Sequence, residues 1–205
     1  MTNPNRRQSL RALGLMAVLG SQVTRPFLPA AEATPALRDG LSAPGAILLI
    51  RHAQTVPGLG DPDHFRLGDC STQRNLSEEG RAASRAWGDW LRQMGLVPTA
   101  VRSSQWCRCL DTARLMFPQQ TVQEWVALNS FFQGHGNRDA QLLMARQAAK
   151  ARARNVPGFE VWVTHQVVIS SLTGQYTSMG EAIVARGVED ASANLQVLGR
   201  SSGPR

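Results

Sequence analysis

Four side chains in this sequence are of the types that hold and attack a phosphoryl group. Arg51 and His52 directly follow the apolar run 46–50, whereas Arg108 and His165 each come after a later apolar run. Arginine donates forked, charge-assisted hydrogen bonds to phosphate oxygens. A neutral imidazole can attack phosphorus, and a second imidazole, when protonated, can stabilise the oxygens. The four residues therefore indicate phosphoryl chemistry, provided that the fold brings them together.

The elements that must position these residues alternate between strand and helix patterns. Strands are predicted over 46–50, 99–102, 121–126 and 159–164, with a closing pair over 181–186 and 195–199. Helices are predicted from Ser77 to Gly95, from a Ser104 N-cap to Pro118, over 138–155 and from 167. Residues 34–45 read as a surface lead-in and 55–75 as a long loop, commonly functional at a strand end. The alternation predicts a three-layer α/β/α domain with a mainly parallel sheet, whose ligand lies beyond the strands' carboxyl ends.

The N-terminal residues have the layout of an export signal. Arg6-Arg7 precede a modest apolar run, 12–19, and Ala31-Glu32-Ala33 offers a cleavage site for a signal peptidase. The paired arginines resemble a twin-arginine signal, although Ser9 stands where that motif usually has Phe. We therefore predict a signal peptide over 1–33 and a single domain over 34–205, in the periplasm or secreted. A disordered basic tail and an uncleaved anchor are the alternatives.

Charge and hydropathy exclude several classes of protein. The chain of 205 residues has a net charge of +7, and 21 of its 22 basic residues are arginine. Four of these arginines and one acid fall within 1–33, so the remaining charge is small and suits an anionic substrate better than a nucleic acid. No apolar stretch reaches the roughly 18 to 20 residues of a membrane span. We expect no nucleic acid partner and no stable membrane insertion after removal of the signal.

The three cysteines, Cys70, Cys107 and Cys109, leave one thiol over if a pair forms. Export would bring them into an oxidising compartment, where thiols tend to pair. Residues i and i+2 of a helix point apart, so Cys107 and Cys109 cannot easily bridge each other. A disulfide from Cys70 to either of them is predicted, and three small apolar fillers are the alternative.

Three segments together resemble the histidine phosphatase superfamily, which has the phosphoglycerate-mutase-like fold. Residues 49–55, Leu-Ile-Arg-His-Ala-Gln-Thr, are similar to its Arg-His-Gly-x-Thr signature. Residues 104–113 resemble its Ser-Pro-x-x-Arg-Ala-x-x-Thr-Ala segment, and 163–165 resemble its late strand-end histidine. The order and spacing of the segments match, and the resemblance covers roughly 46–200. The loop 69–75 and the run 106–108 look most like a small periplasmic branch that includes a protein assigned to lipopolysaccharide core heptose phosphate.

The resemblance implies a role for each matching residue. His52 would be the nucleophile that becomes phosphohistidine, Arg51 and Arg108 would hold the phosphoryl oxygens, and His165 would complete the pocket. Thr55 and Gln166 would contact the substrate. No cofactor and no metal are implied, and the activity would be hydrolysis of a phosphorylated small molecule or sugar.

The sequence departs from the family pattern at two places. Ala53 replaces the glycine of the first motif, where a methyl group is tolerable. Ser130 stands where the family's proton-donating glutamate is expected, and Glu124 is predicted to lie within a strand. In another branch an aspartate directly follows the late histidine, where this chain has Gln166. A difficult alkyl phosphate would need another acid, for which the candidates are Asp61, Asp63 and Asp139.

The missing acid keeps other readings open. A phosphate-binding or sensory module that has lost turnover is the main alternative to a phosphomonoesterase, and a phosphotransferase or mutase is a further one. A metal site from Asp61, Asp63, His64 and Cys70 matches no familiar spacing. His135 is read as a loop residue with a minor chance of touching substrate. Trp87 and Trp90 are read as packing residues.

Overall fold

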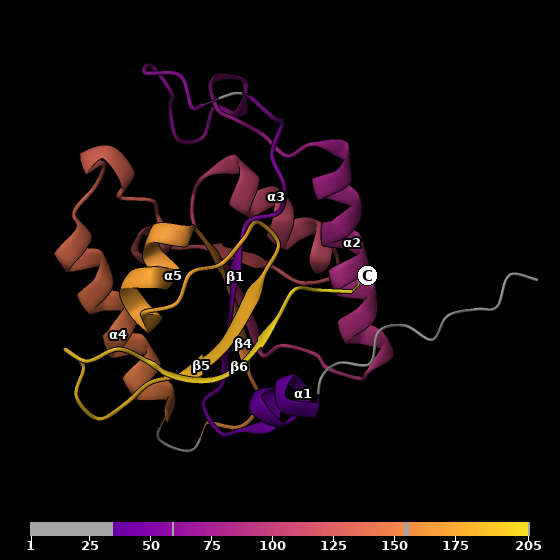
Figure 1. Ribbon diagram of the computed structural model, residues 1–205, viewed down its shortest axis with the longest axis vertical. Helices are drawn as coiled ribbons and strands as arrows, with labels where there is room; N and C mark the ends of the chain where they lie inside the picture. Colours follow the sequence, from indigo (N-terminus) through magenta and orange to yellow (C-terminus); the bar gives the residue numbers. More distant parts are fainter. Residues whose placement is uncertain (1–34, 59, 154–155, 205) are drawn as a thin grey trace, which may run out of the picture.

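The computed structural model describes residues 35–58, 60–153 and 156–204, so the predicted signal peptide over 1–33 lies outside the described residues. A six-stranded sheet lies between two layers of helices (Figure 1). The strands are β1 (Ile47–Arg51), β2 (Ala100–Ser103), β3 (Val122–Glu124), β4 (Glu160–Thr164), β5 (Ala182–Arg186) and β6 (Gln196–Ser201). The α-helices are α1 (Pro35–Ser42), α2 (Glu78–Gln93), α3 (Cys107–Met116), α4 (Arg138–Ala153) and α5 (Gln166–Thr173).

The sheet has the strand order β3-β2-β4-β1-β5-β6. The four strands β3, β2, β4 and β1 are parallel, whereas β5 runs antiparallel to β1 and β6 antiparallel to β5. The β1–β4 register pairs Ile47 with Glu160 and Arg51 with Thr164. The predicted three-layer α/β/α architecture with a mainly parallel sheet is therefore confirmed, as is the closing pair of strands.

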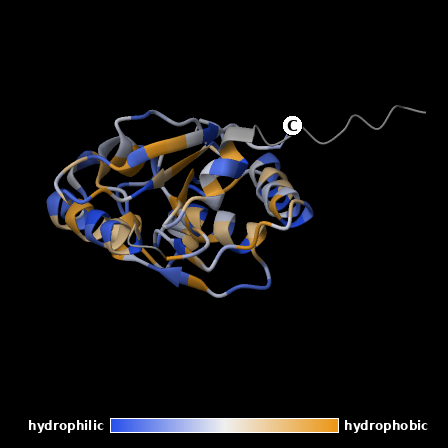
Figure 2. Ribbon diagram, turned by 90° about the horizontal axis from the view of Figure 1, so that it is seen from below, coloured by the Kyte–Doolittle hydropathy of each residue, from blue (hydrophilic) through white to orange (hydrophobic). Residues whose placement is uncertain are grey.

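Two apolar cores flank the sheet because successive side chains of a strand point to opposite faces. Leu48 and Ile50 of β1 pack with Leu91 of α2, in the core that also takes in α1 and α3. Ile47 and Leu49 belong to the other core, with buried residues of α4 and α5. In Figure 1, α4 and α5 lie on one side of the strands and α2 and α3 on the other. Figure 2 shows the hydrophobic colour concentrated in the central strands and the hydrophilic colour on the outer helices.

Helix α1 corrects the expectation that residues 34–45 are only a surface lead-in. Leu37 and Leu41 are buried one helical turn apart and belong to the first core, which holds α1 against the sheet. The segment was misread because eight residues with Pro35 and Gly40 give a weak helical pattern.

Helix α2 begins as predicted, since the Ser77 side chain accepts a hydrogen bond from the Gly80 N–H. Its first turn approaches the backbone that follows His52 closely: a Cβ added at Gly80 would lie 2.0 Å from the Gln54 carbonyl oxygen. Only glycine permits that contact. The same helix contains Trp87 and Trp90, which are buried packing residues as predicted.

Helix α3 begins later than the sequence indicates. The predicted N-cap was Ser104, but the first helical residue is Cys107 and the N-cap is Trp106, without a side-chain cap hydrogen bond. The Ser104 hydroxyl is used elsewhere, in a network with His165 described below. Helix propensity alone cannot reveal such a competing partner. Among the described helices, none is long and apolar enough to cross a lipid bilayer.

Candidate active site

The predicted functional residues meet at the carboxyl edge of the parallel strands. His52 follows β1 and His165 follows β4, and the backbone N–H of His52 donates to the Thr164 carbonyl at 2.9 Å. The Ser104 N–H, after β2, donates to the Val163 carbonyl at 2.9 Å. Strand pairing thus continues to the point where each functional segment leaves the sheet. This edge is where open α/β sheets bind ligands.

A cavity of about 560 Å³ opens at this edge. The described residues in its wall include all four that sequence reasoning assigned to catalysis: Arg51, His52, Arg108 and His165. The wall also has an aromatic part, with Phe65, Trp106 and Phe132. The cavity therefore combines cationic and imidazole groups with an apolar side, as small-molecule sites commonly do.

His52 has one ring nitrogen committed and one available. Its Nδ1 lies 2.9 Å from the Ala53 carbonyl oxygen, which can only accept, so Nδ1 carries the proton and Nε2 keeps its lone pair. Burial, followed by the nearby charge of Arg108, holds the pKa of His52 well below its usual value of 6.5. His52 is therefore neutral at neutral pH, which is the form that can act as a nucleophile.

His165 is oriented by a chain of hydrogen bonds. The Ser104 hydroxyl donates to Asn129 Oδ1 at 3.0 Å, so its oxygen is free to accept from His165 Nε2–H at 2.9 Å. Asn129 is itself held by Gln105, whose backbone N–H donates to Oδ1 at 2.8 Å. Burial and then Arg108 hold the pKa of His165 well below 6.5. A protonated His165 would therefore require a negative charge nearby, such as that of an anion bound in the cavity.

Three arginines line the cavity, one more than the sequence indicated. Arg51 Nη1 donates to the Thr177 carbonyl at 2.8 Å, and the Arg108 guanidinium lies 4.4 Å from the Trp106 ring centre. Arg74 is the residue that sequence reasoning missed. Burial and the charge of Arg108 lower the pKa of Arg74, because like charges crowd the same cavity. The only sequence signal for Arg74 is its position immediately before residues 75–77, which lead into a predicted helix.

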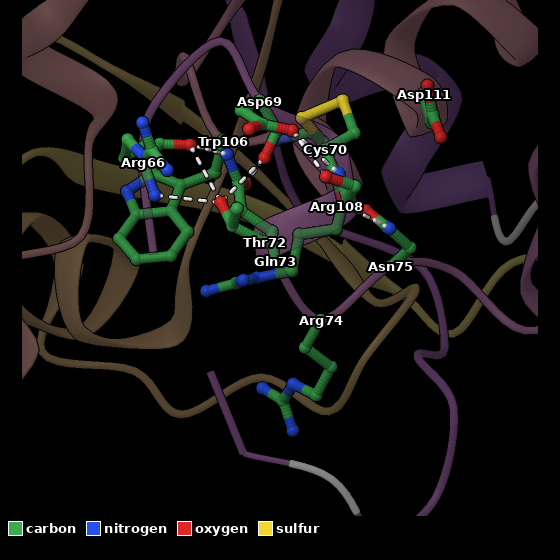
Figure 3. Close-up of a disulfide and its surroundings, with 12 residues drawn as sticks. Arg66, Asp69, Cys70, Thr72, Gln73, Arg74, Asn75, Trp106, Arg108 and Asp111 are labelled. Atoms are coloured by element: carbon green, nitrogen blue, oxygen red, sulfur yellow. Dashed lines mark hydrogen bonds between the residues drawn. A yellow bond between two sulfur atoms is a disulfide. The ribbon is translucent and has the colours of Figure 1, made fainter. Parts of the chain in front are cut away.

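A disulfide holds the loop between β1 and α2 against the start of α3 (Figure 3). Cys70 and Cys107 are joined, with Cα atoms 5.6 Å apart, so the structure selects one of the two predicted pairings. The Gln73 side chain accepts from the Cys107 N–H at 3.0 Å and reinforces the same contact. Cys109 is free and buried, and burial raises its pKa to about 12, so it remains a thiol. The disulfide is adjacent in sequence to Arg108 and thus fixes the loop beside the cavity.

The two residues predicted to contact the substrate differ in their position relative to the cavity. Gln166, the first residue of α5, lines the cavity, and its amide donates to Ser170 Oγ at 2.8 Å. Thr55 is buried with its hydroxyl directed to the Met179 sulfur at 3.7 Å, outside the cavity wall. A substrate contact by Thr55 therefore stays a prediction, and the bridge between Thr55 and Leu76 helps to anchor the loop.

The structure places some of the candidate acids in the cavity wall and others outside it. Ser130 lines the cavity, and so do Asp61 and Asp63. Asp139 is exposed at the start of α4 and pairs with Arg138, and Glu124 is exposed at the end of β3.

The remaining histidines differ in position. His135 lines the cavity wall, where its ring lies edge-on to Phe65 at 5.0 Å, whereas His64 is exposed outside the wall. Within the described part of the chain, no group of three His, Cys, Asp or Glu side chains is placed to hold a metal ion.

Part of the chain matches the model of a known protein family. Residues 47–135 match the family model of the histidine phosphatase superfamily, branch 1. This match contains Arg51, His52 and Arg108, whereas His165 lies beyond it. Over this segment the chain is similar to the histidine phosphatase superfamily. No curated protein matches the chain in a sequence search.

Solved structures share the fold at low sequence identity. The protein histidine phosphatase SixA complexed with tungstate is 13% identical with a TM-score of 0.53, covering 76% of this chain and 95% of its own. The ecdysone phosphate phosphatase of Bombyx mori, also with tungstate, is 13% identical with a TM-score of 0.56, covering 78% and 93%. The product of open reading frame Rv3214 from Mycobacterium tuberculosis is 23% identical with a TM-score of 0.50, covering 77% and 98%.

Proposed function

We propose that this protein is a phosphomonoesterase that works through a phosphohistidine on His52. The observation that carries the proposal is the unprotonated Nε2 of His52 in a cavity that also holds Arg51, Arg108 and His165. The proteins with the same fold named above include a protein histidine phosphatase and an ecdysone phosphate phosphatase. Their names support phosphoryl chemistry and leave the substrate of this chain open.

The reaction has two steps. In the first, His52 Nε2 forms a bond to phosphorus, the P–O ester bond breaks with its electron pair going to the ester oxygen, and that oxygen takes a proton from an acid or from water as the alcohol leaves. Arg51 and Arg108 stabilise the charge on the phosphoryl oxygens, and a protonated His165 adds to them. In the second, water attacks phosphorus and gives up a proton to a base or to solvent, and the electron pair of the broken P–N bond returns to Nε2.

The test is turnover of 4-nitrophenyl phosphate by the wild-type chain and by His52→Ala. We expect the variant to lose activity by about a thousandfold or more, because no other group replaces the nucleophile. His64→Ala removes an exposed histidine outside the cavity wall and should retain full activity. Acid-labile label from a ³²P substrate should be trapped on wild type and not on His52→Ala.

The main alternative is a phosphate-binding module, which is favoured by the hydroxyl of Ser130 where the family's acid is expected. Tight binding of inorganic phosphate by a wild-type chain that shows no turnover would contradict the enzyme and support the module. Circular dichroism of His52→Ala establishes that a loss of activity is not a loss of folding.

The proposal extends to location and branch. The protein is exported to the periplasm or secreted, as the twin-arginine-like pattern over 1–33 predicts. The Cys70–Cys107 disulfide supports this, because disulfides persist in oxidising compartments. The loop 69–75 and the run 106–108 support the small periplasmic branch of the superfamily. The substrate is a phosphorylated small molecule or sugar.

A further inference from the structure

One carboxylate of the long loop lies in direct contact with the phosphate-binding cation. Asp61 Oδ1 lies 2.9 Å from Arg108 Nη1 and accepts the Arg74 backbone N–H at 3.0 Å. The Arg108 side chain is 5% exposed and that of Asp61 is 21% exposed, so the ion pair is mostly inside the cavity wall. The backbone hydrogen bond fixes the position of Asp61 independently of the arginine. The loop between β1 and α2 thus places a carboxyl group at a defined point.

The Arg108 guanidinium retains capacity for a second anion beside Asp61. Asp61 takes one nitrogen, Nη1, and Arg108 Nε is buried without a hydrogen-bond partner. Guanidinium has five donors in a planar fork, so a phosphoryl group can bind the same side chain. Binding there brings the phosphoryl oxygens next to the Asp61 carboxyl group.

The described cavity wall contains one other acid that could donate a proton to the leaving group. Asp63 also lines the cavity but is exposed, and Asp61 contacts Arg108 directly. Ser130, in the slot of the family's acid, is a hydroxyl and a poor proton donor. Asp61 is therefore the acid best placed to serve a leaving group of a phosphoryl ester held by Arg108.

We propose that Asp61 is the general acid of this enzyme and that its substrate class is the alkyl phosphomonoester. This inference rests on the proposed function. As Nε2 of His52 bonds to phosphorus and the P–O bond breaks, the electron pair goes to the alkyl oxygen, which takes the proton of Asp61. In the second step the Asp61 carboxylate takes a proton from the attacking water, and the P–N electron pair returns to His52. Each turnover ends with Asp61 protonated again.

An alkyl substrate is the class for which such an acid matters. An alkoxide is a poor leaving group and needs a proton as it departs, whereas a nitrophenolate leaves readily without one. General acid catalysis contributes about 10²–10⁴-fold to such reactions. A pocket with no acid would serve only substrates with good leaving groups.

The experiment compares Asp61→Asn and Asp139→Asn on two substrates, 4-nitrophenyl phosphate and glycerol 2-phosphate. Asn keeps the Oδ1 that accepts the Arg74 N–H. We expect Asp61→Asn to keep aryl kcat within about threefold and to lose alkyl kcat by about 100-fold or more. Asp139→Asn changes an exposed carboxylate outside the cavity wall and should leave both rates unchanged. The ratio of the two rates does not depend on the fraction of folded protein.

Four results would contradict the proposal, each in a different part. Equal losses on both substrates in Asp61→Asn would make Asp61 a positioning residue, and no loss on either would make it a bystander. A wild-type chain that hydrolyses the aryl ester and not the alkyl ester would contradict the substrate class while leaving the phosphatase intact. A wild-type chain that hydrolyses neither would contradict the proposed function itself.

Discussion

His52 and His165 share a buried setting beside Arg108 that disfavours the charged imidazolium. Their ring centres are 5.5 Å apart, so a positive charge on one also opposes a charge on the other. Both rings are therefore neutral at neutral pH. A bound phosphoryl dianion changes that balance, since it supplies the negative charge that a protonated His165 needs.

This setting predicts a loss of stability on mild acidification. The pKa values of His52 and His165 lie well below 6.5 in the folded chain, whereas in the unfolded chain they are near 6.5. The unfolded state therefore binds more protons below about pH 6.5, and the free energy of unfolding falls there by up to about 1.4 kcal/mol per pH unit for each histidine. Urea unfolding at about pH 7.5, 6.5 and 5.5 measures the slope.

His165→Asn should show a shallower slope than wild type, because one buried imidazole remains. His64→Asn removes an exposed histidine and should keep the wild-type slope. Identical slopes in wild type and His165→Asn would contradict the assignment of the pH effect to the cavity histidines.

At the scale of single residues, the sequence predicts which site residues follow regular strands. It predicts little about the site residues that come from loops. Arg51, His52 and His165 stand at strand ends, where hydrophobic patterning fixes their position. Arg74 and Asp61 reach the cavity from an irregular loop, whose path depends on hydrogen bonds such as that from the Arg74 N–H to Asp61. No periodicity encodes such a path.

The long loop between β1 and α2 is an element in its own right, fastened at several points. The disulfide joins it to α3, and Asn75 donates to the Cys70 carbonyl at 2.7 Å. Patterning located this loop and limited the disulfide to two pairings, but the choice of Cys107 depends on where α3 begins. The start of α3 in turn depends on the engagement of Ser104 by Asn129 and His165. The short helix α1 was missed because its two buried leucines give the only helical signal.

Removal of the disulfide should destabilise the protein and loosen the Asp61–Arg108 contact. Cys70 and Cys107 are 37 residues apart, for which the chain-entropy relation gives about 4 kcal/mol of stabilisation. We expect Cys70→Ser/Cys107→Ser to lower the free energy of unfolding by about 2–4 kcal/mol, measured by urea denaturation.

Wild type in the presence of a thiol reductant should behave like the double variant, because both lack the covalent link. Cys109→Ala keeps the disulfide. Its free energy of unfolding should therefore still drop on reduction, as that of wild type does. A double variant as stable as the oxidised wild type would contradict a structural role for this bond.

The whole molecule joins one cationic cavity to a predicted export signal. Of the arginines in the chain, four lie within 1–33 and three line the cavity. Overall composition predicted an anionic substrate but could not place the charge. The layered architecture was predictable because strand and helix patterns alternate along most of the chain.

Export should depend on the paired arginines. We expect Arg6→Lys/Arg7→Lys to retain a C-terminally tagged chain in the cytoplasm as a full-length precursor, because the twin-arginine address is read by a receptor. Arg11→Lys, which preserves the pair, should be exported normally. Cell fractionation followed by immunoblotting measures both. Release of the double variant at the wild-type level would rule out this route.

The pairing of Arg51 with Thr164 places the two functional histidines at one level on neighbouring strands. Because side chains alternate between faces, gaining or losing one residue inside β1 or β4 would turn a histidine toward the wrong helix layer. Descendants of this chain can therefore remodel the loops around the cavity over time, while the lengths of these two strands stay under strict selection.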